Sequence, residues 1–268
     1  MTSKLLKYIY IEFRTRIRSI IIWSIIWIAL AALIAWMYTP IRDQGGFNEF
    51  IESFDPTLLE AFNISPDYLS KAETFLSGEF LTSLFLIGAI YSSVIGVNSL
   101  GGKITDKTII NVFTKKISRP YIYLAASIVN LLSNLLSNLL IGIGTFISFS
   151  LILDESISIQ FILNAFIAVF LIMLFFSQLG QLLGITLNKG TSVGVTAGIA
   201  SIGWLLDSLK NLEDYPDILK PLTPYYYFNS DRLAQEYTLD MKITVLVVFS
   251  IIFAALGVYY FRRKNVYI

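Results

Sequence analysis

The stretch SIVNLLSNLLSNLLIGIGTFISFS, Ser127 to Ser150, decides how the rest of this sequence is interpreted. Its composition indicates an apolar helix suited to lipid, yet it contains Asn130, Asn134 and Asn138 at four-residue spacing. At 100° per residue, the three side chains share one face of the helix. An unpaired amide is costly in hydrocarbon, so this face is predicted to contact protein or a hydrated path.

A matching polar set occurs later in the chain, in the apolar run at residues 161–187, as Ser177, Gln178 and Gln181. Two interpretations of these amides stay open. Hydrogen bonds between the two helices would hold them together. Alternatively, the amides line part of a path through the membrane, and the candidate lining residues are Asn130, Asn134, Asn138, Gln178 and Gln181.

The composition supports a membrane protein and excludes several kinds of chemistry. Of the 268 residues, 55% are hydrophobic and 15% charged, and the net charge of +1 gives no basic field for nucleic acid. The chain has no cysteine and no histidine. Disulfides, thiolate nucleophiles, zinc sites built on these residues and histidine-based triads are therefore excluded. We expect no enzyme and no metal or cofactor in this chain.

Apolar runs of about 20 residues, enough to cross a hydrocarbon core, predict an all-α integral membrane protein. The six predicted spans are residues 19–39, 80–98, 121–152, 161–187, 192–207 and 243–261. They belong to one transmembrane domain, residues 1–268. Its outer segments are predicted at 40–79 and 208–242, and its main inner segment at 101–120.

The charges between the spans predict the orientation. With the N-terminus in the cytoplasm, 14 of the 20 lysines and arginines lie inside, as the positive-inside rule requires. All acidic residues except Glu12 and Asp106 then lie outside or at the outer edges. Both termini are therefore predicted to be cytoplasmic.

Two amphipathic segments are predicted outside the spans. Residues 47–63 place phenylalanines on one face and glutamates on the other, which is typical of a helix at the outer membrane interface. Residues 104–116 predict a short cytoplasmic helix with an apolar face and flanking lysines. The Gly-Gly-Lys at 101–103 is no phosphate loop, because Val97 and Ile104 stand where that motif needs glycine and Ser or Thr.

Four segments together resemble the permease subunits of ABC type 2 exporters. They are EFRTRIRSIIIWSIIWIALAALIAWMY (12–38), DKTIINVFTKKISRPYIYLA (106–125), LTPYYYFN (222–229) and YYFRRKNVYI (259–268). The resemblance covers nearly the whole chain. Its most specific part is KTIINVFTKKISR, residues 107–119.

This resemblance implies that the short cytoplasmic helix is a coupling helix seated in a groove of an ATPase subunit. The coupling residues would be Asp106, Thr108, Ile109, Ile110, Val112, Phe113, Ser118 and Arg119. Lys103 and Lys116 depart from the family pattern, where an acid and a proline are common. The implied partners are two cytoplasmic ABC ATPase subunits carrying ATP and magnesium, a second permease, identical or homologous, and membrane lipid.

The resemblance also implies a seam between two permeases at the first and fifth spans. Small residues that permit close helix contact are Ala31, Ala35, Gly190, Gly194 and Gly198. Packing of these residues within one subunit is the alternative.

The resemblance therefore implies the permease of an exporter of hydrophobic or amphipathic cargo, and the charge pattern suits a prokaryotic plasma membrane. The alternative is an ion-coupled carrier or channel. Such carriers use ionisable residues inside their spans, whereas Glu79 and Asp207 are expected only at outer ends.

Overall fold

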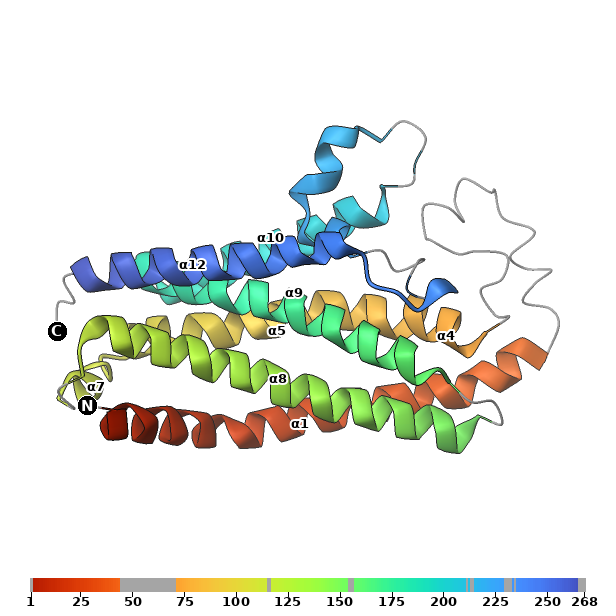
Figure 1. The fold of residues 1–268 in the computed structure, drawn as a ribbon, viewed down its shortest axis with the longest axis horizontal. Helices are drawn as coiled ribbons and strands as arrows, with labels where there is room; N and C mark the ends of the chain where they lie inside the picture. The colour runs from red at the N-terminus through yellow and green to blue at the C-terminus, as the bar shows by residue number, and fades with distance from the viewer. Residues whose placement is uncertain are drawn as a thin grey trace.

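The computed structural model describes residues 2–43, 71–114, 117–153, 157–210, 212, 215–228, 233 and 235–264. These residues form a bundle of long helices (Figure 1), and no strand occurs among them. The all-α prediction is thus confirmed for the described part of the chain. The amphipathic helix predicted at 47–63 lies outside the described residues.

The long helices follow the predicted apolar runs. They are α1 (Thr2–Asp43), a continuous helix from Ala72 to Thr105, α8 (Arg119–Ile152), α9 (Ile159–Thr186), α10 (Lys189–Ser208) and α12 (Thr244–Arg263). The Ala72–Thr105 helix combines α4 (Ala72–Phe75), π-helical η1 (Leu76–Leu81), α5 (Thr82–Val97), π-helical η2 (Asn98–Gly102) and α6 (Lys103–Thr105). Short elements are α7 (Ile110–Phe113) and the 3₁₀ turns η3 (Asp217–Leu222), η4 (Pro224–Tyr227) and η5 (Met241–Ile243).

Five of these helices are long and apolar enough to cross a membrane: Lys4–Asp43, Ala72–Thr105, Arg119–Ile152, Ile159–Thr186 and Met241–Arg263. The predicted span at 192–207 does form a helix, α10, of 20 residues. It is not among the five, because its glycines, serines and threonines make it less apolar. Six membrane crossings therefore stay a prediction.

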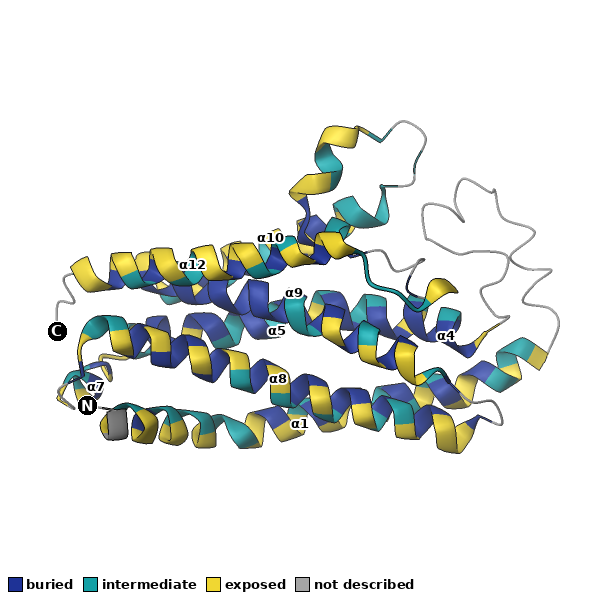
Figure 2. Ribbon diagram, viewed as in Figure 1, coloured by how far each residue is buried: buried dark blue, intermediate teal, exposed yellow. Residues whose placement is uncertain are grey.

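Helix α9 occupies the centre of the bundle, packing against α5, α8, α10 and α12. Its inner surface is buried on several sides (Figure 2). Helix α1 lies along α8 at one edge of the bundle (Figure 1) and runs in the same direction. The direction follows from paired contacts, since Arg16 meets Asn130 and Ile28 meets Gly144.

Glycines allow α5 and α9 to touch through their backbones. A Cβ atom added at Gly96 would lie 2.1 Å from the carbonyl oxygen of Ser177, and one at Gly180 would lie 2.5 Å from that of Ser93. At the end of the contact, a Cβ at Gly101 would lie 2.5 Å from the carbonyl oxygen of Gly184. Such close approach is how helices pack where lipid removes the hydrophobic drive.

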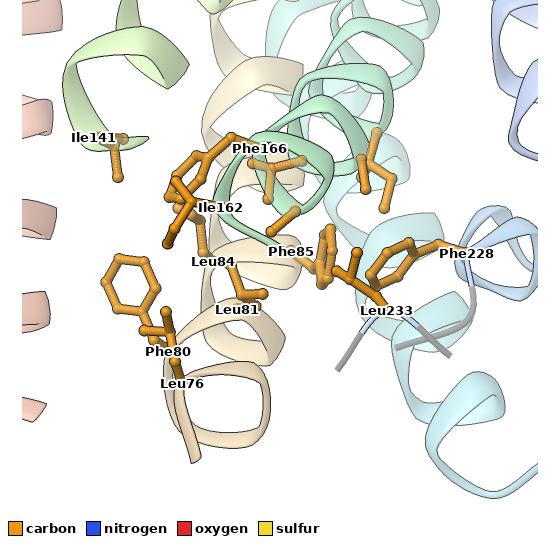
Figure 3. Close-up of a cluster of buried hydrophobic side chains, with 14 of the residues drawn as sticks. Leu76, Phe80, Leu81, Leu84, Phe85, Ile141, Ile162, Phe166, Phe228 and Leu233 are labelled. Atoms are coloured by element: carbon orange, nitrogen blue, oxygen red, sulfur yellow. The ribbon is translucent and has the colours of Figure 1, made fainter. Parts of the chain in front are cut away.

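The opposite end from the termini has an apolar core of large side chains, drawn in Figure 3. Phe228 packs on Phe85, with ring centroids 4.5 Å apart, and Tyr225 is also buried. Glu73 accepts a hydrogen bond of 2.9 Å from the backbone nitrogen of Ser158, the N-cap of α9. A carboxylate there is favourable because a helix N-terminus carries positive partial charge.

Both ends of the described chain lie at the same end of the bundle, beside α7 (Figure 1). Arg119 donates to the carbonyl oxygen of Lys264, and the Lys264 ammonium donates to the carbonyl oxygen of Ile185. Burial lowers the pKa of Lys264. Most described basic residues are at this end: Lys4, Lys7, Arg14, Arg16, Arg18, Lys103, Lys107, Arg119, Lys189, Arg262, Arg263 and Lys264.

We expect Gly96→Ala to destabilise the protein by about 1–3 kcal/mol, because the new methyl group meets a backbone carbonyl that cannot move aside. The measurement is the melting temperature of the purified chain in detergent. Gly194→Ala is the matched control, since a Cβ there has nothing within 4 Å. Alanine favours helix over glycine, so this control should be neutral or slightly stabilising. Equal melting temperatures for the two variants would contradict the glycine contact.

Candidate functional site

A row of buried amides on α8 faces α9. Asn130, Asn134 and Asn138 are at most 3% exposed. Their spacing of four residues aligns them with Gln181, Ser177 and Met173 in turn, because α9 runs antiparallel to α8. These residues define the amide row.

Asn130 has the most complete set of hydrogen bonds in the amide row. Its Nδ2 donates to Oε1 of Gln181 at 2.6 Å, and its Oδ1 accepts from the Arg16 guanidinium at 2.6 Å. Gln181 in turn donates to the carbonyl oxygen of Tyr123 at 3.0 Å. Three helices, α1, α8 and α9, therefore meet at one asparagine.

Asn134 and Asn138 have weaker hydrogen bonds to α9 than Asn130 has. Asn134 donates to the Ser177 hydroxyl at 3.1 Å and to the Met173 carbonyl oxygen at 3.2 Å. Asn138 donates within its own helix, to the Asn134 carbonyl oxygen, and to the sulfur of Met173 at 3.1 Å. The Oδ1 atoms of both asparagines and Oε1 of Gln178 are buried without a hydrogen-bond partner.

In this structure the amide row is a contact between helices and is shielded from solvent. Gln178 is buried beside the row but makes no hydrogen bond to the asparagines. A path along these residues would therefore require α8 and α9 to separate. Whether the amide row serves only to hold α8 and α9 together or also lines a path stays a prediction.

Arg16 makes a contact that the sequence analysis did not predict. Helix α1 is continuous from Thr2, and the Arg16 guanidinium reaches buried Asn130. One turn earlier, Oε2 of Glu12 lies 2.5 Å from the Lys103 ammonium. The signal in the sequence was the four-residue spacing of Tyr8, Glu12 and Arg16, which gives them one shared face.

The segment between the second long helix and α8, predicted to be a cytoplasmic helix over 104–116, has a different local structure. Instead of a helix over 104–116, it has a turn at 106–109 and the one-turn helix α7. Lys107 has a φ of 56° in this turn, a left-handed conformation that ends the preceding helix. The segment is therefore folded back onto the bundle.

This folding back gives several of the predicted ATPase-contact residues neighbours within the chain itself. Ile109 and Val112, expected in a partner's groove, are 1% and 4% exposed and pack in the chain's own core. Ile110 and Phe113 are half-buried, and Phe113 lies against Arg119, with 5.3 Å from ring centroid to guanidinium carbon. Apolar side chains at a water-facing bundle end are covered by the bundle itself because their burial is favourable.

The exposed side of the segment is polar. It consists of Thr105, Asp106, Lys107, Thr108, Asn111, Thr114 and Ser118, which we name the polar ridge. Asp106, Thr108 and Ser118 belong to the predicted coupling set. The Asp106 carboxylate lies 4.0 Å from the Lys189 ammonium at the start of α10.

The predicted seam residues separate into two groups. Ala31 and Ala35 are fully buried against the chain's own helices, as the alternative of packing within one subunit expects. The stripe on α10 is open instead. Gly190 and Gly194 are exposed, and Cβ atoms built at Gly194 and Gly198 meet nothing within 4 Å.

Comparison with known proteins identifies no relative, since no protein-family model matches the chain and no curated protein matches it.

We expect Asn130→Leu to destabilise the protein by about 2–4 kcal/mol, because the half-buried Arg16 guanidinium and the buried Gln181 amide both lose Asn130 as a partner. Asn138→Leu is the matched control from the same helix face. It loses only a bond within the helix and a weak bond to sulfur, so its cost should stay below about 1 kcal/mol. Thermal melting of both variants tests this order, and a larger loss for Asn138→Leu would contradict it.

A second prediction concerns the segment around α7. Ile109→Asp should lower the melting temperature by about 5–10 °C, because it places a carboxylate in the apolar core of that end. The neighbouring Thr108 is exposed, so Thr108→Asp should leave the melting temperature unchanged. Equal stability of these adjacent variants would show that the segment's apolar side faces away from the bundle.

Proposed function

We propose that this chain is the membrane-spanning permease subunit of an ATP-driven exporter of the ABC type 2 family. It would move a hydrophobic or amphipathic cargo out of the cell, with energy from a separate ATPase subunit. Two ATPase subunits, with their ATP and magnesium, and a second permease would complete the complex. We place it as a multi-pass protein of a prokaryotic plasma membrane, with six crossings and both termini in the cytoplasm.

The observation that carries this proposal is the position of α7. It lies between the second and third long helices, at the end of the bundle where both chain ends and most basic residues gather (Figure 1). The positive-inside rule assigns this end to the cytoplasm. Residues 107–119 are also the part of the sequence that most specifically resembles the family's coupling helix.

The distribution of carboxylates favours an external energy source. Acidic residues of the described long helices lie toward helix ends, as Glu12, Asp43, Glu73, Glu79 and Asp207 do. Proton- and sodium-driven carriers place such groups near the middle of the membrane, where they bind the driving ion. The amide row supplies polarity at depth without a carboxylate.

The folded-back segment modifies the expected ATPase contact. Its apolar residues hold α7 on the bundle, and the polar ridge faces away from it. We therefore assign docking to the ridge, with Asp106, Thr108, Asn111 and Ser118 as contact residues. Ile109 and Val112 transmit displacement, because they pack α7 against the core.

The absence of cysteine gives a clean test, since a single introduced cysteine is unique. Asn111→Cys, on the ridge, should crosslink to a protein that carries a Walker A motif when membranes of the native host are treated with a photoactivated thiol reagent. Ile218→Cys is the control, because Ile218 is 76% exposed at the opposite end. The captured protein is identified by mass spectrometry.

Purified with that ATPase in proteoliposomes, the chain should support transport that stops without ATP and continues with a protonophore present. Capture of the same proteins at both cysteines would show that the ridge has no specific partner. Transport that collapses with the proton gradient and ignores ATP would contradict the proposal and favour an ion-coupled carrier.

A further inference from the structure

Three arginines near the start of α1 alternate in direction. Arg14 and Arg18 are one turn apart and share a face, whereas Arg16 lies about 200° away from each, at 100° per residue. The Arg16 guanidinium bonds buried Asn130, and Glu12 pairs with Lys103. These contacts set the rotation of α1, so Arg14 and Arg18 point away from the bundle, and both are exposed.

A shallow hollow of about 440 Å³ lies between these two arginines and the apolar surface beside them. Its lining residues are Arg14, Ile17, Arg18, Ile21 and Ile22, all from α1. The apolar part continues along the same helix, since Ile21, Ile22 and Ile25 are 44%, 51% and 59% exposed. The hollow is therefore lined almost entirely by apolar atoms, and the two arginines stand at one end of the same uncovered surface.

Neither arginine has an acidic partner among the described residues. Glu12, the nearest carboxylate in the sequence, pairs with Lys103. Two guanidinium groups one turn apart match the several oxygens of a phosphate, to which arginine donates paired hydrogen bonds. The site is thus complementary to a phosphate that carries an apolar chain.

The depth of the hollow in the membrane indicates that this phosphate belongs to a lipid headgroup. Arg18 directly precedes the uncharged run at 19–39, so the arginines lie at the headgroup level and the isoleucines enter the hydrocarbon. From Arg14 to Ile22 the helix rises about 12 Å, the scale of a headgroup plus the first acyl carbons. We propose that this hollow binds an anionic phospholipid of the cytoplasmic leaflet, its phosphate between Arg14 and Arg18 and an acyl chain along Ile21 and Ile22.

The test titrates the purified full-length chain with phosphatidylglycerol or phosphatidylcholine and measures bound lipid by native mass spectrometry. The parent chain should prefer phosphatidylglycerol. Arg14→Gln with Arg18→Gln should reduce that preference about tenfold, because each arginine near an anionic headgroup contributes to binding. Arg262→Gln with Arg263→Gln is the control, with the same charge change on exposed residues at the same end of the bundle, and should retain the preference within twofold.

Equal losses in the two double variants would show a general attraction of basic residues for anionic lipid and would overturn the site. Retention of the preference by the Arg14 and Arg18 variant would also overturn it. Unchanged melting temperatures are expected for both variants, because all four side chains are exposed.

Two further arms identify the occupant. Ile21→Ser with Ile22→Ser should weaken phosphatidylglycerol binding, and soluble glycerol phosphate should not displace the lipid; displacement would show that the headgroup alone is bound. Ile22→Cys reports a second copy of this chain, since the chain has no other cysteine. An efficient disulfide between two such chains would place a protein on this surface and overturn the lipid site.

Discussion

The bundle depends on how α9 is held by its neighbours without help from the hydrophobic effect, which is weak between helices that are both bathed in lipid. On one side, glycines bring its backbone against α5, so that Gly96 and Gly180 each face a carbonyl oxygen. On another side, the amide row bonds it to α8. Glycines without side chains bring α9 close to α5, and hydrogen bonds between side chains bring α9 close to α8. Helices α10 and α12 then pack on a fixed centre.

Asn130 links α1, the helix at the edge of the bundle, to this central packing. Because Arg16 bonds it from α1 while Gln181 bonds it from α9, the rotation of the outermost helix is tied to the central one. The contact also separates the three arginines near the start of α1 by role: Arg16 bonds Asn130 inside the bundle, and Arg14 and Arg18 are exposed at the surface. A cluster that looks like a uniform positive flank in the sequence is thus divided by helix geometry.

The long helices could be predicted from the sequence because apolar runs of membrane length are direct physical signals. The polar match between the asparagines and the residues near Ser177 was likewise readable, since identical spacing on antiparallel helices brings them into register. What the sequence could not predict is which neighbour covers an apolar face within the chain. Ile109, Val112, Ala31 and Ala35 have the composition of contact residues, but periodicity cannot distinguish contact with the same chain from contact with another. The glycines at 180 and 184 had a readable spacing, yet their partner carbonyls are fixed only by tertiary packing.

The ion pair between Glu12 and Lys103 sits one turn of α1 away from the bond between Arg16 and Asn130. Lys103 opens the stretch that leads to α7, so α1 is attached within two turns both to the α7 segment and to the buried amides. On the proposed function, a displacement of that segment would strain the ion pair or turn α1 about its axis. If α1 turns, the guanidinium leaves Asn130 and one buried acceptor is vacated at the end of the amide row nearest α7. On the proposed function, α1 then converts a displacement of the α7 segment into a change of hydrogen bonding among α1, α8 and α9.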